Sequence, residues 1–166
     1  MQGQPVPSIV SAFLNNLRRP EYVHVLLNHL PLTGLLAALL GLIWSIITAN
    51  RRAVHAGLFL VALFAVSIWP VAEFGEQAYD RVYSMADDRG DAYLKSHREL
   101  AERWTWIYYL TAAVAAGGSL AGRFWPKSLL PVACLAAALS VASLSAGAAI
   151  ASLGAKVRHS EFRKGG

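Results

Sequence analysis

The five histidines are the residues of this chain best suited to chemistry, because imidazole is a common ligand of haem iron, zinc and copper. Four of them, His24, His29, His97 and His159, stand where long apolar stretches begin or end. His24 and His29 are five residues apart, about 140° around a helix, so their rings cannot easily share one site. We expect His29, with Thr33 one turn further on, to be the one that takes part in a site.

The three histidines His29, His97 and His159 would come from three different helices at a similar depth, as a site between helices requires. The expected cofactor is haem b held by two of them, or a transition metal held by all three. Glu76 and Glu161 are candidate further metal ligands or hydrogen-bond partners of the ligands.

The surroundings of two of these histidines permit a site. Four residues follow His97 at helical spacing and could wall a pocket: Ala101, Trp104, Thr105 and Tyr108. The residues before His159 on its own helix face are alanine and serine, a shallow surface that could admit a flat macrocycle. Two alternatives stay open: histidines hydrogen-bonded to water or lipid at headgroup level with no cofactor, or a proton relay.

Other chemistries find little support in the sequence. The single cysteine, Cys134, excludes an intrachain disulfide and a Cys-x-x-Cys-His haem attachment. No nucleophile, base and orienting group can be assembled from the spacing, so we do not expect catalysis by this chain alone. No charged residue lies deep within an apolar stretch, which disfavours a transporter or a proton channel.

The elements that must position the histidines are membrane-spanning helices. The chain has 166 residues, 55% hydrophobic and only 15% charged, with a mean hydropathy of +0.41. Uncharged runs of about 20 residues are long enough to cross a bilayer. We predict an all-α integral membrane protein of residues 22–154, whose four spans occupy the ranges 22–49, 53–74, 97–122 and 128–154. The short links between paired spans indicate an up-down-up-down four-helix bundle.

The segments outside the spans are polar or amphipathic. In residues 1–21, Ser8 could cap a short helix with apolar residues on one side, which predicts a helix on the membrane surface. A docking helix for a partner subunit is the alternative. Residues 75–96 form a polar connection in which the range 87–91 is expected to be a solvated turn. Ser96 and Glu99 form a capping-box pattern that would start the third span. Residues 155–166 are a basic tail.

The topology places both termini and the 75–96 connection on one side. That side carries eleven Lys and Arg residues against four on the other, which predicts cytoplasmic termini. The net charge of +5 therefore fits lipid headgroups better than nucleic acid, which we do not expect as a partner. The small-residue patterns Gly118-x3-Gly122, Ser143-x3-Gly147 and Ala37-x3-Gly41 allow close helix contacts, within the chain, in a homo-oligomer or with other membrane subunits.

Four short motifs carry a resemblance. They are Asn28-His29-Leu30-Pro31, Gly75-Glu76, His97 and Arg158-His159-Ser160-Glu161. Together they resemble those of uncharacterised four-helix proteins of the bacterial inner membrane. The resemblance implies that location and gives weight to those positions, and it supplies no reaction.

The sequence thus predicts a small membrane subunit that carries haem b or a metal near one membrane face, within a respiratory or other electron-transfer complex. The alternative is a structural or assembly subunit of a larger membrane complex that binds no cofactor.

Overall fold

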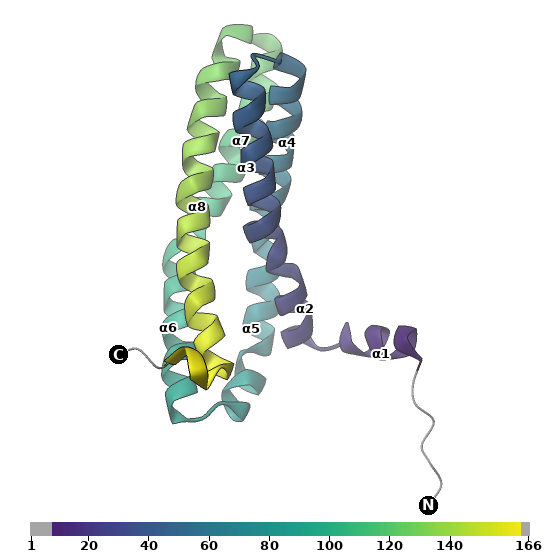
Figure 1. Ribbon diagram of the computed structural model, residues 1–166, viewed down its shortest axis with the longest axis vertical. Coiled ribbons are helices and arrows are strands. Elements are labelled where there is room, and N and C mark those ends of the chain that lie inside the picture. Colours follow the sequence, from purple (N-terminus) through teal and green to yellow (C-terminus); the bar gives the residue numbers. More distant parts are fainter. Residues whose placement is uncertain (1–7, 164–166) are drawn as a thin grey trace, which may run out of the picture.

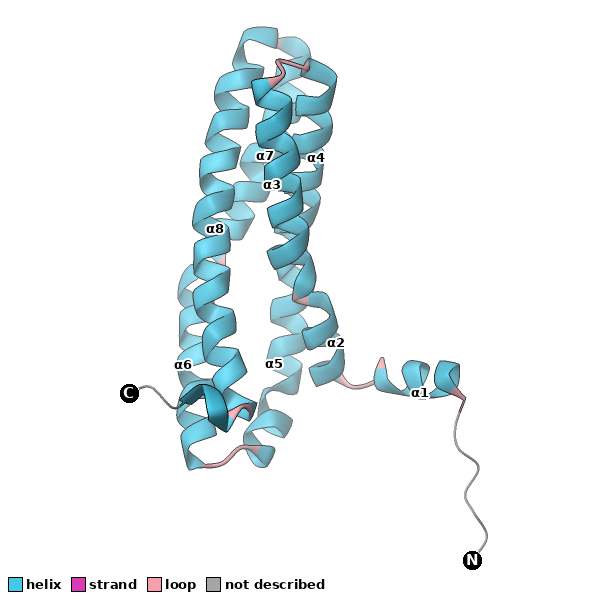
Figure 2. Cartoon of the chain, viewed as in Figure 1, coloured by secondary structure: helices cyan, strands magenta, loops and turns pink. Residues whose placement is uncertain are grey.

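The structure, a computed structural model, describes residues 8–163, and that range folds into helices without a strand (Figure 2). The elements are α1 (Ile9–Asn16), α2 (Pro20–Leu27), the π-helix η1 (Leu30–Gly34), α3 (Leu35–Ile47), α4 (Arg51–Val66), α5 (Ile68–Met85), α6 (Asp88–Trp104), α7 (Trp106–Phe124), the short 3-10 helix η2 (Pro126–Ser128), α8 (Leu129–Arg158) and the 3-10 helix η3 (Ser160–Arg163). The prediction of an all-helical chain is confirmed.

Stacked helices form columns that run alongside one another (Figure 1). One column joins α2, η1 and α3, the next joins α4 and α5, the third joins α6 and α7, and α8 stands alone. Three stretches are long and apolar enough to cross a membrane. Their bounds are Pro20–Ile47, Arg51–Met85 and Pro126–Arg158. The α6–α7 column is not among them, because α6 is strongly polar and α7 is rich in glycine, alanine and interfacial aromatic residues.

Helix breaks divide three of the columns near the middle of their length. Pro70 has no N–H to donate to the carbonyl of Val66, so α4 ends there and α5 begins two residues later. Pro31 has the same effect in the first column, where a π-helix replaces one α-helical turn. The breaks separate a half built from α3, α4, α7 and the first part of α8 from a half built from α2, α5, α6 and the rest of α8.

The first of these, which we call the packed half, is closed by small residues and aliphatic side chains. Each of its helices touches both neighbours, and α4 also reaches α8 across the centre. Leu35, Leu42, Leu58 and Val61 are fully buried there. A Cβ atom on Gly118 would clash with Val132, so the glycine sets how closely α7 approaches α8. Gly118 therefore serves packing within the chain.

The second, which we call the split half, consists of two helix pairs. The first pair is α2 with α5, and the second is α6 with α8. Contacts between the two pairs are few, in contrast to the packed half. The Arg98 side chain is one link between them, since its Nη2 donates to Glu76 Oε1 of α5 at 2.7 Å.

Helix continues through almost all of the polar connection predicted at 75–96, and the solvated turn expected at 87–91 is wrong. Helix α5 runs on to Met85 and α6 begins at Asp88, which leaves only two residues between them. The predicted capping role of Ser96 is also wrong, since this residue lies inside α6 and its Oγ donates to the Ala92 carbonyl. The residue that caps α6 is Asp87, whose Oδ1 accepts from the backbone N–H of Gly90 at 2.7 Å.

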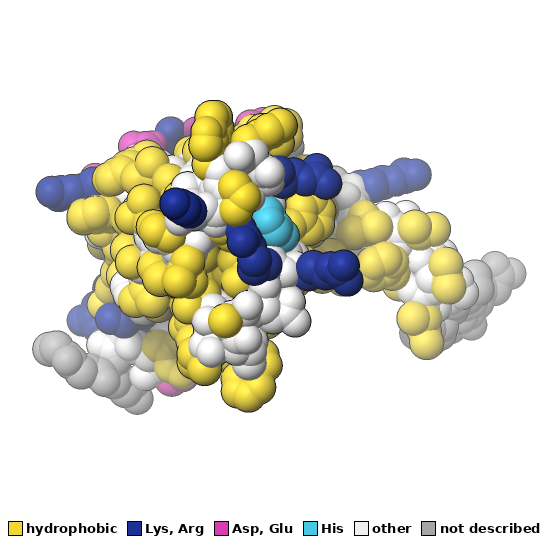
Figure 3. Space-filling model, turned by 90° about the horizontal axis from the view of Figure 1, so that it is seen from above, with side chains coloured by type: hydrophobic (Ala, Val, Ile, Leu, Met, Phe, Trp, Pro, Cys, Tyr) yellow, Lys and Arg dark blue, Asp and Glu magenta, His cyan; other side chains and the backbone are white. Residues whose placement is uncertain are grey.

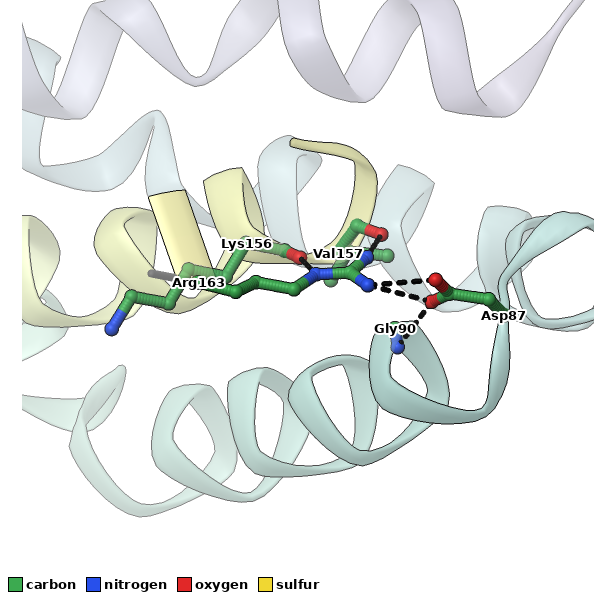
Figure 4. Close-up of polar contacts among 5 residues, drawn as sticks. All are labelled: Asp87, Gly90, Lys156, Val157 and Arg163. Carbon is green, nitrogen blue, oxygen red and sulfur yellow. Dashed lines mark hydrogen bonds and ion pairs between the residues drawn. The ribbon is translucent and has the colours of Figure 1, made fainter. Parts of the chain in front are cut away.

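A clasp at the end of the split half ties the C-terminal segment to this cap (Figure 4). Arg163 Nη1 donates to both carboxylate oxygens of Asp87 at 2.8 Å. Its Nε and Nη2 donate to the carbonyls of Lys156 and Val157, which lack partners at the end of α8. The Arg163 side chain is only 7% exposed. One guanidinium thus satisfies the end of α8 and holds it against the start of α6.

Helix α1 projects sideways from the columns at the level of α2 (Figure 1). The predicted helix and its cap are confirmed, since Ser8 Oγ accepts from the Ser11 N–H. Ile9, Val10 and Leu14 are largely exposed, and none of the α1 residues is buried. The apolar side of α1 is therefore not covered by the described part of this chain.

Candidate cofactor site

A cavity of about 80 Å³ lies in the split half, just below the packed half. His24 of α2 lines it from one helix pair and His97 of α6 lines it from the other, with Tyr108 of α7 beside them. Ala101 and Thr105 also line it, as the spacing after His97 predicts, whereas Trp104 of the same predicted wall does not. The cavity therefore brings together two histidines from separate helix pairs.

Each of the two rings is held by a backbone carbonyl of a neighbouring helix. His24 Nδ1 lies 2.8 Å from the carbonyl oxygen of Val71 in α5, and His97 Nδ1 lies 2.8 Å from that of Ile150 in α8. A carbonyl oxygen can only accept, so Nδ1 carries a proton in both rings, and in the neutral imidazole Nε2 is then the nitrogen that can bind a metal. This is the arrangement by which proteins orient an imidazole for metal coordination.

A glycine one helical turn after each accepting carbonyl makes room for both rings. Gly75 lies four residues after Val71, and a Cβ there would be 2.9 Å from His24 Nδ1. Gly154 lies four residues after Ile150, and a Cβ there would be 3.1 Å from His97 Nδ1. Each histidine thus lies against the helix turn between an accepting carbonyl and a glycine, and the two halves of the site are built alike.

The two rings are close enough to share a ligand. Their centroids are 6.4 Å apart and their planes are nearly perpendicular, at 86°. Two in-line metal–nitrogen bonds of about 2.0 Å each, together with the two ring radii, span about 6 Å between ring centres.

Tyr108 supplies a further polar atom at this cavity. The residue is fully buried, and its hydroxyl has no hydrogen-bond partner among residues 8–163. A Cβ on Gly147 would clash with that hydroxyl, so this glycine makes space for it. A buried hydroxyl without a partner is costly, which indicates that a bound group or water completes it.

The histidine set predicted from the sequence is not brought together. Exposed His29 faces away from the cavity site, and its Nδ1 bonds the Val25 carbonyl one turn earlier in its own helix at 3.1 Å. Exposed His159 pairs with Glu161, with 2.8 Å between Nδ1 and Oε1. Glu76 is engaged by Arg98. Within the part of the chain that the structure describes, no three His, Cys, Asp or Glu side chains lie close enough to hold a metal. Of the three histidines, only His97 lines the cavity.

Glu161 has an electrostatic environment of its own. The pKa of the Glu161 carboxyl is held below its usual range, chiefly by a hydrogen bond from its own backbone N–H and next by one from the His159 side chain. The pair is more than half exposed. It therefore acts as a local contact of the C-terminal turn.

The sequence contains a signal for His24 that the choice of His29 overlooks. His24 precedes Pro31 by 7 residues and Leu35 by 11, so these three lie on one helix face. Pro31 and Leu35 are fully buried. His29 instead shares its face with Thr33 and Leu36, which are exposed. Extending the buried stripe of the first span towards its start would have selected His24.

Comparison with protein-family models, curated proteins and solved structures finds no match. The function is therefore argued from the residues of the chain itself.

Proposed function

We propose that this chain is a multi-pass membrane protein in which all four columns cross the bilayer as an up-down-up-down bundle. Three stretches meet the length and apolarity that a span requires, and α7 would complete the fourth. Large apolar side chains on the outer surface support this, among them Leu40, Trp44 and Phe59, which are at least 60% exposed. Such surface is unusual for a soluble protein and suits lipid tails.

The proposed orientation places both termini in the cytoplasm of a bacterial cell, on the side rich in Lys and Arg. Helix α1 would then lie on that membrane surface. Its sideways direction and exposed apolar side chains support this placement.

Within the bundle we propose a haem b held by His24 and His97, in a subunit that carries electrons for a respiratory or other membrane complex. The observation that carries the proposal is the pair of histidine rings in one cavity, with centroids 6.4 Å apart and each Nδ1 on a carbonyl. The hydrogen bonds to Val71 and Ile150 would orient both rings and raise the basicity of Nε2. When bound, haem supplies one-electron redox chemistry.

The number of protein ligands favours haem over a bare metal ion. Structural zinc takes four protein ligands, and catalytic zinc takes three. The cavity offers two histidines and, among the described residues, no third His, Cys, Asp or Glu in a cluster with them. In haem the porphyrin supplies four nitrogens, so two axial histidines complete the iron.

The form of the split half bears on the fit of a macrocycle. The cavity of about 80 Å³ is smaller than a porphyrin. A plane perpendicular to the line between the two rings, however, would extend between the α2–α5 pair and the α6–α8 pair, where contacts are few. Binding of a porphyrin would therefore require the α2–α5 pair and the α6–α8 pair to move apart. The Tyr108 hydroxyl would face the group from the packed side.

Haem content in four matched histidine variants tests the assignment. The full chain would be expressed in a bacterial host, purified in detergent, and assayed for haem and metals per polypeptide. We expect His24→Ala and His97→Ala to abolish stoichiometric haem, and His29→Ala and His159→Ala to retain it. Loss of haem in His29→Ala or His159→Ala, together with retention of haem in His24→Ala, would contradict the assignment. A haem-free wild type with a stoichiometric metal would exclude haem.

The alternative, a structural or assembly subunit without a cofactor, has one specific observation in its favour. Ala37 and Gly41 form a small-residue pair on the outer face of α3, and a Cβ on Gly41 would meet nothing within 4 Å. If that face binds another membrane subunit, Gly41→Ile should abolish co-purification while the histidine variants assemble normally. Gly118 and Gly147 do not test association, because both are packed inside the chain.

A further inference from the structure

The face between α4 and α7 in the packed half contains a second feature, far from the two histidines of the cofactor site. A groove of about 690 Å³ runs along these helices. Its length is lined by apolar side chains, including Phe59, Leu63 and Val66 of α4 and Ala116 of α7. Its end is lined by Arg52, His55 and Arg123. The groove thus has an apolar body and a cationic end.

The charges at that end have no internal counterpart. No Asp or Glu occurs in residues 22–72 or 103–160, which contain all the elements of the packed half. Every ion pair within residues 8–163 lies in the split half instead, and none involves Arg52 or Arg123. Seen from this end, Lys and Arg side chains surround a histidine amid apolar surface (Figure 3). An anionic group is therefore the complement that the groove lacks.

His55 adds a polar contact that bridges the two helices. Its Nδ1 lies 3.2 Å from Ser119 Oγ of α7. The ring also approaches Gly122, where a Cβ would be 3.2 Å from Cε1. His55 and Ser119 therefore add hydrogen-bonding groups to the groove lining that contains the two arginines.

We propose that this groove binds one anionic phospholipid, with its phosphate on Arg52 and Arg123 and an acyl chain along the apolar residues of α4 and α7. Arginine suits this role because its planar fork matches phosphate oxygens. Basic pockets between spanning helices are known to select anionic headgroups. The lipid site rests on the proposed membrane location but not on the proposed haem. Failure of the haem assignment would therefore leave it untouched.

Native mass spectrometry of the delipidated full chain in detergent tests the proposal. The probes are phosphatidylglycerol and phosphatidylcholine with identical acyl chains. We expect one phosphatidylglycerol to bind preferentially and Arg52→Gln or Arg123→Gln to weaken it about fivefold each. Lys127→Gln is the matched control, because it removes a charge from the same end outside the groove lining and should leave binding unchanged.

Two further arms define failure. Equal binding of the two lipids, or equal loss with Lys127→Gln, would overturn the proposal in favour of general attraction to the charged end. If inorganic phosphate alone displaces the lipid, the groove binds phosphate without using the acyl chain, and the proposal of a phospholipid site is overturned. Should Arg52→Gln fail to fold, Arg52→Lys keeps the charge and removes the fork, and is expected to weaken binding by a smaller factor.

Discussion

The packed half and the split half contain the same four columns but use them differently. In the packed half, small residues bring every helix against its neighbours, and the core is apolar. In the split half, the columns separate into two pairs with a histidine facing inward from each. The ion pairs gather there too, so polar contacts at the rim take the place of apolar packing. The contrast is between a half closed by apolar packing and a half whose two helix pairs leave a small cavity lined by His24 and His97.

The sharpest test of the packed half is Gly118→Ala. The new Cβ would clash with Val132, which is stiff in a helix, so overpacking should cost about 1–3 kcal/mol. Gly117→Ala is the matched control, because a Cβ there meets nothing within 4 Å and should gain about 1 kcal/mol of helix propensity. Thermal unfolding in detergent would measure both. Similar effects at the two positions would contradict the close α7–α8 contact.

In the split half, Gly154→Ala should act on the cofactor site rather than on the fold. Its Cβ would lie 3.1 Å from the His97 ring and shift it away from the Ile150 carbonyl. Loss of such a supporting hydrogen bond typically weakens ligation by about tenfold or more. Haem titration of the purified variant would show this, with Gly41→Ala as the control in open space. Unchanged affinity would mean that the carbonyl does not orient the ring.

Tyr108→Phe tests the unpartnered hydroxyl at the boundary between the packed half and the split half. In haem-free protein, removal of a buried hydroxyl without a partner should raise the free energy of unfolding by about 1 kcal/mol. Chemical unfolding of wild type and variant, both stripped of haem, would measure the difference. A less stable variant would show that the hydroxyl already has a partner without the cofactor.

The smallest effect concerns the clasp at the far end of the split half. Arg163, and then the Gly90 N–H, hold the pKa of Asp87 below its ordinary value of 3.8. A lowered carboxylate pKa means that the clasp stabilises the fold above pH 3.8 and is lost as the pH falls through the lower folded value. Hydrogen-exchange protection of η3, corrected for intrinsic rates, should therefore be level from pH 7 to about 4 and fall below. Asp87→Asn keeps the cap and removes the charge, so its profile should be flat.

The sequence predicts the packed half better than the split half. Apolar length and short links fix the helices there, because hydrophobic stretches and turns are local properties. The polar composition of 75–96 predicts a connection there but not how far α5 and α6 extend into it, because the ends of polar helices depend on their caps. Asp87 was the stronger cap, since its carboxylate is also paired with Arg163, 76 residues away.

The candidate cofactor site is likewise predictable only where it depends on spacing within one helix. His97 and the wall formed by Ala101, Thr105 and Tyr108 follow from helical spacing on one element. The partner histidine depends on which face of α2 turns inward, and the only sequence signal for it is that His24 continues the face of Pro31 and Leu35. Residue type does not reveal that the carbonyls of Val71 and Ile150 accept hydrogen bonds from the histidines. The glycines four residues after each, Gly75 and Gly154, are the only part of this arrangement visible in the sequence.

The central claim is most directly tested by the reduced-minus-oxidised absorption spectrum of the wild-type chain, purified in detergent from cells supplied with haem precursors. The account predicts the bands of a six-coordinate, low-spin haem b with two histidine ligands, and their loss in both His24→Ala and His97→Ala. A colourless wild-type preparation, or a spectrum unchanged by both substitutions, would contradict it.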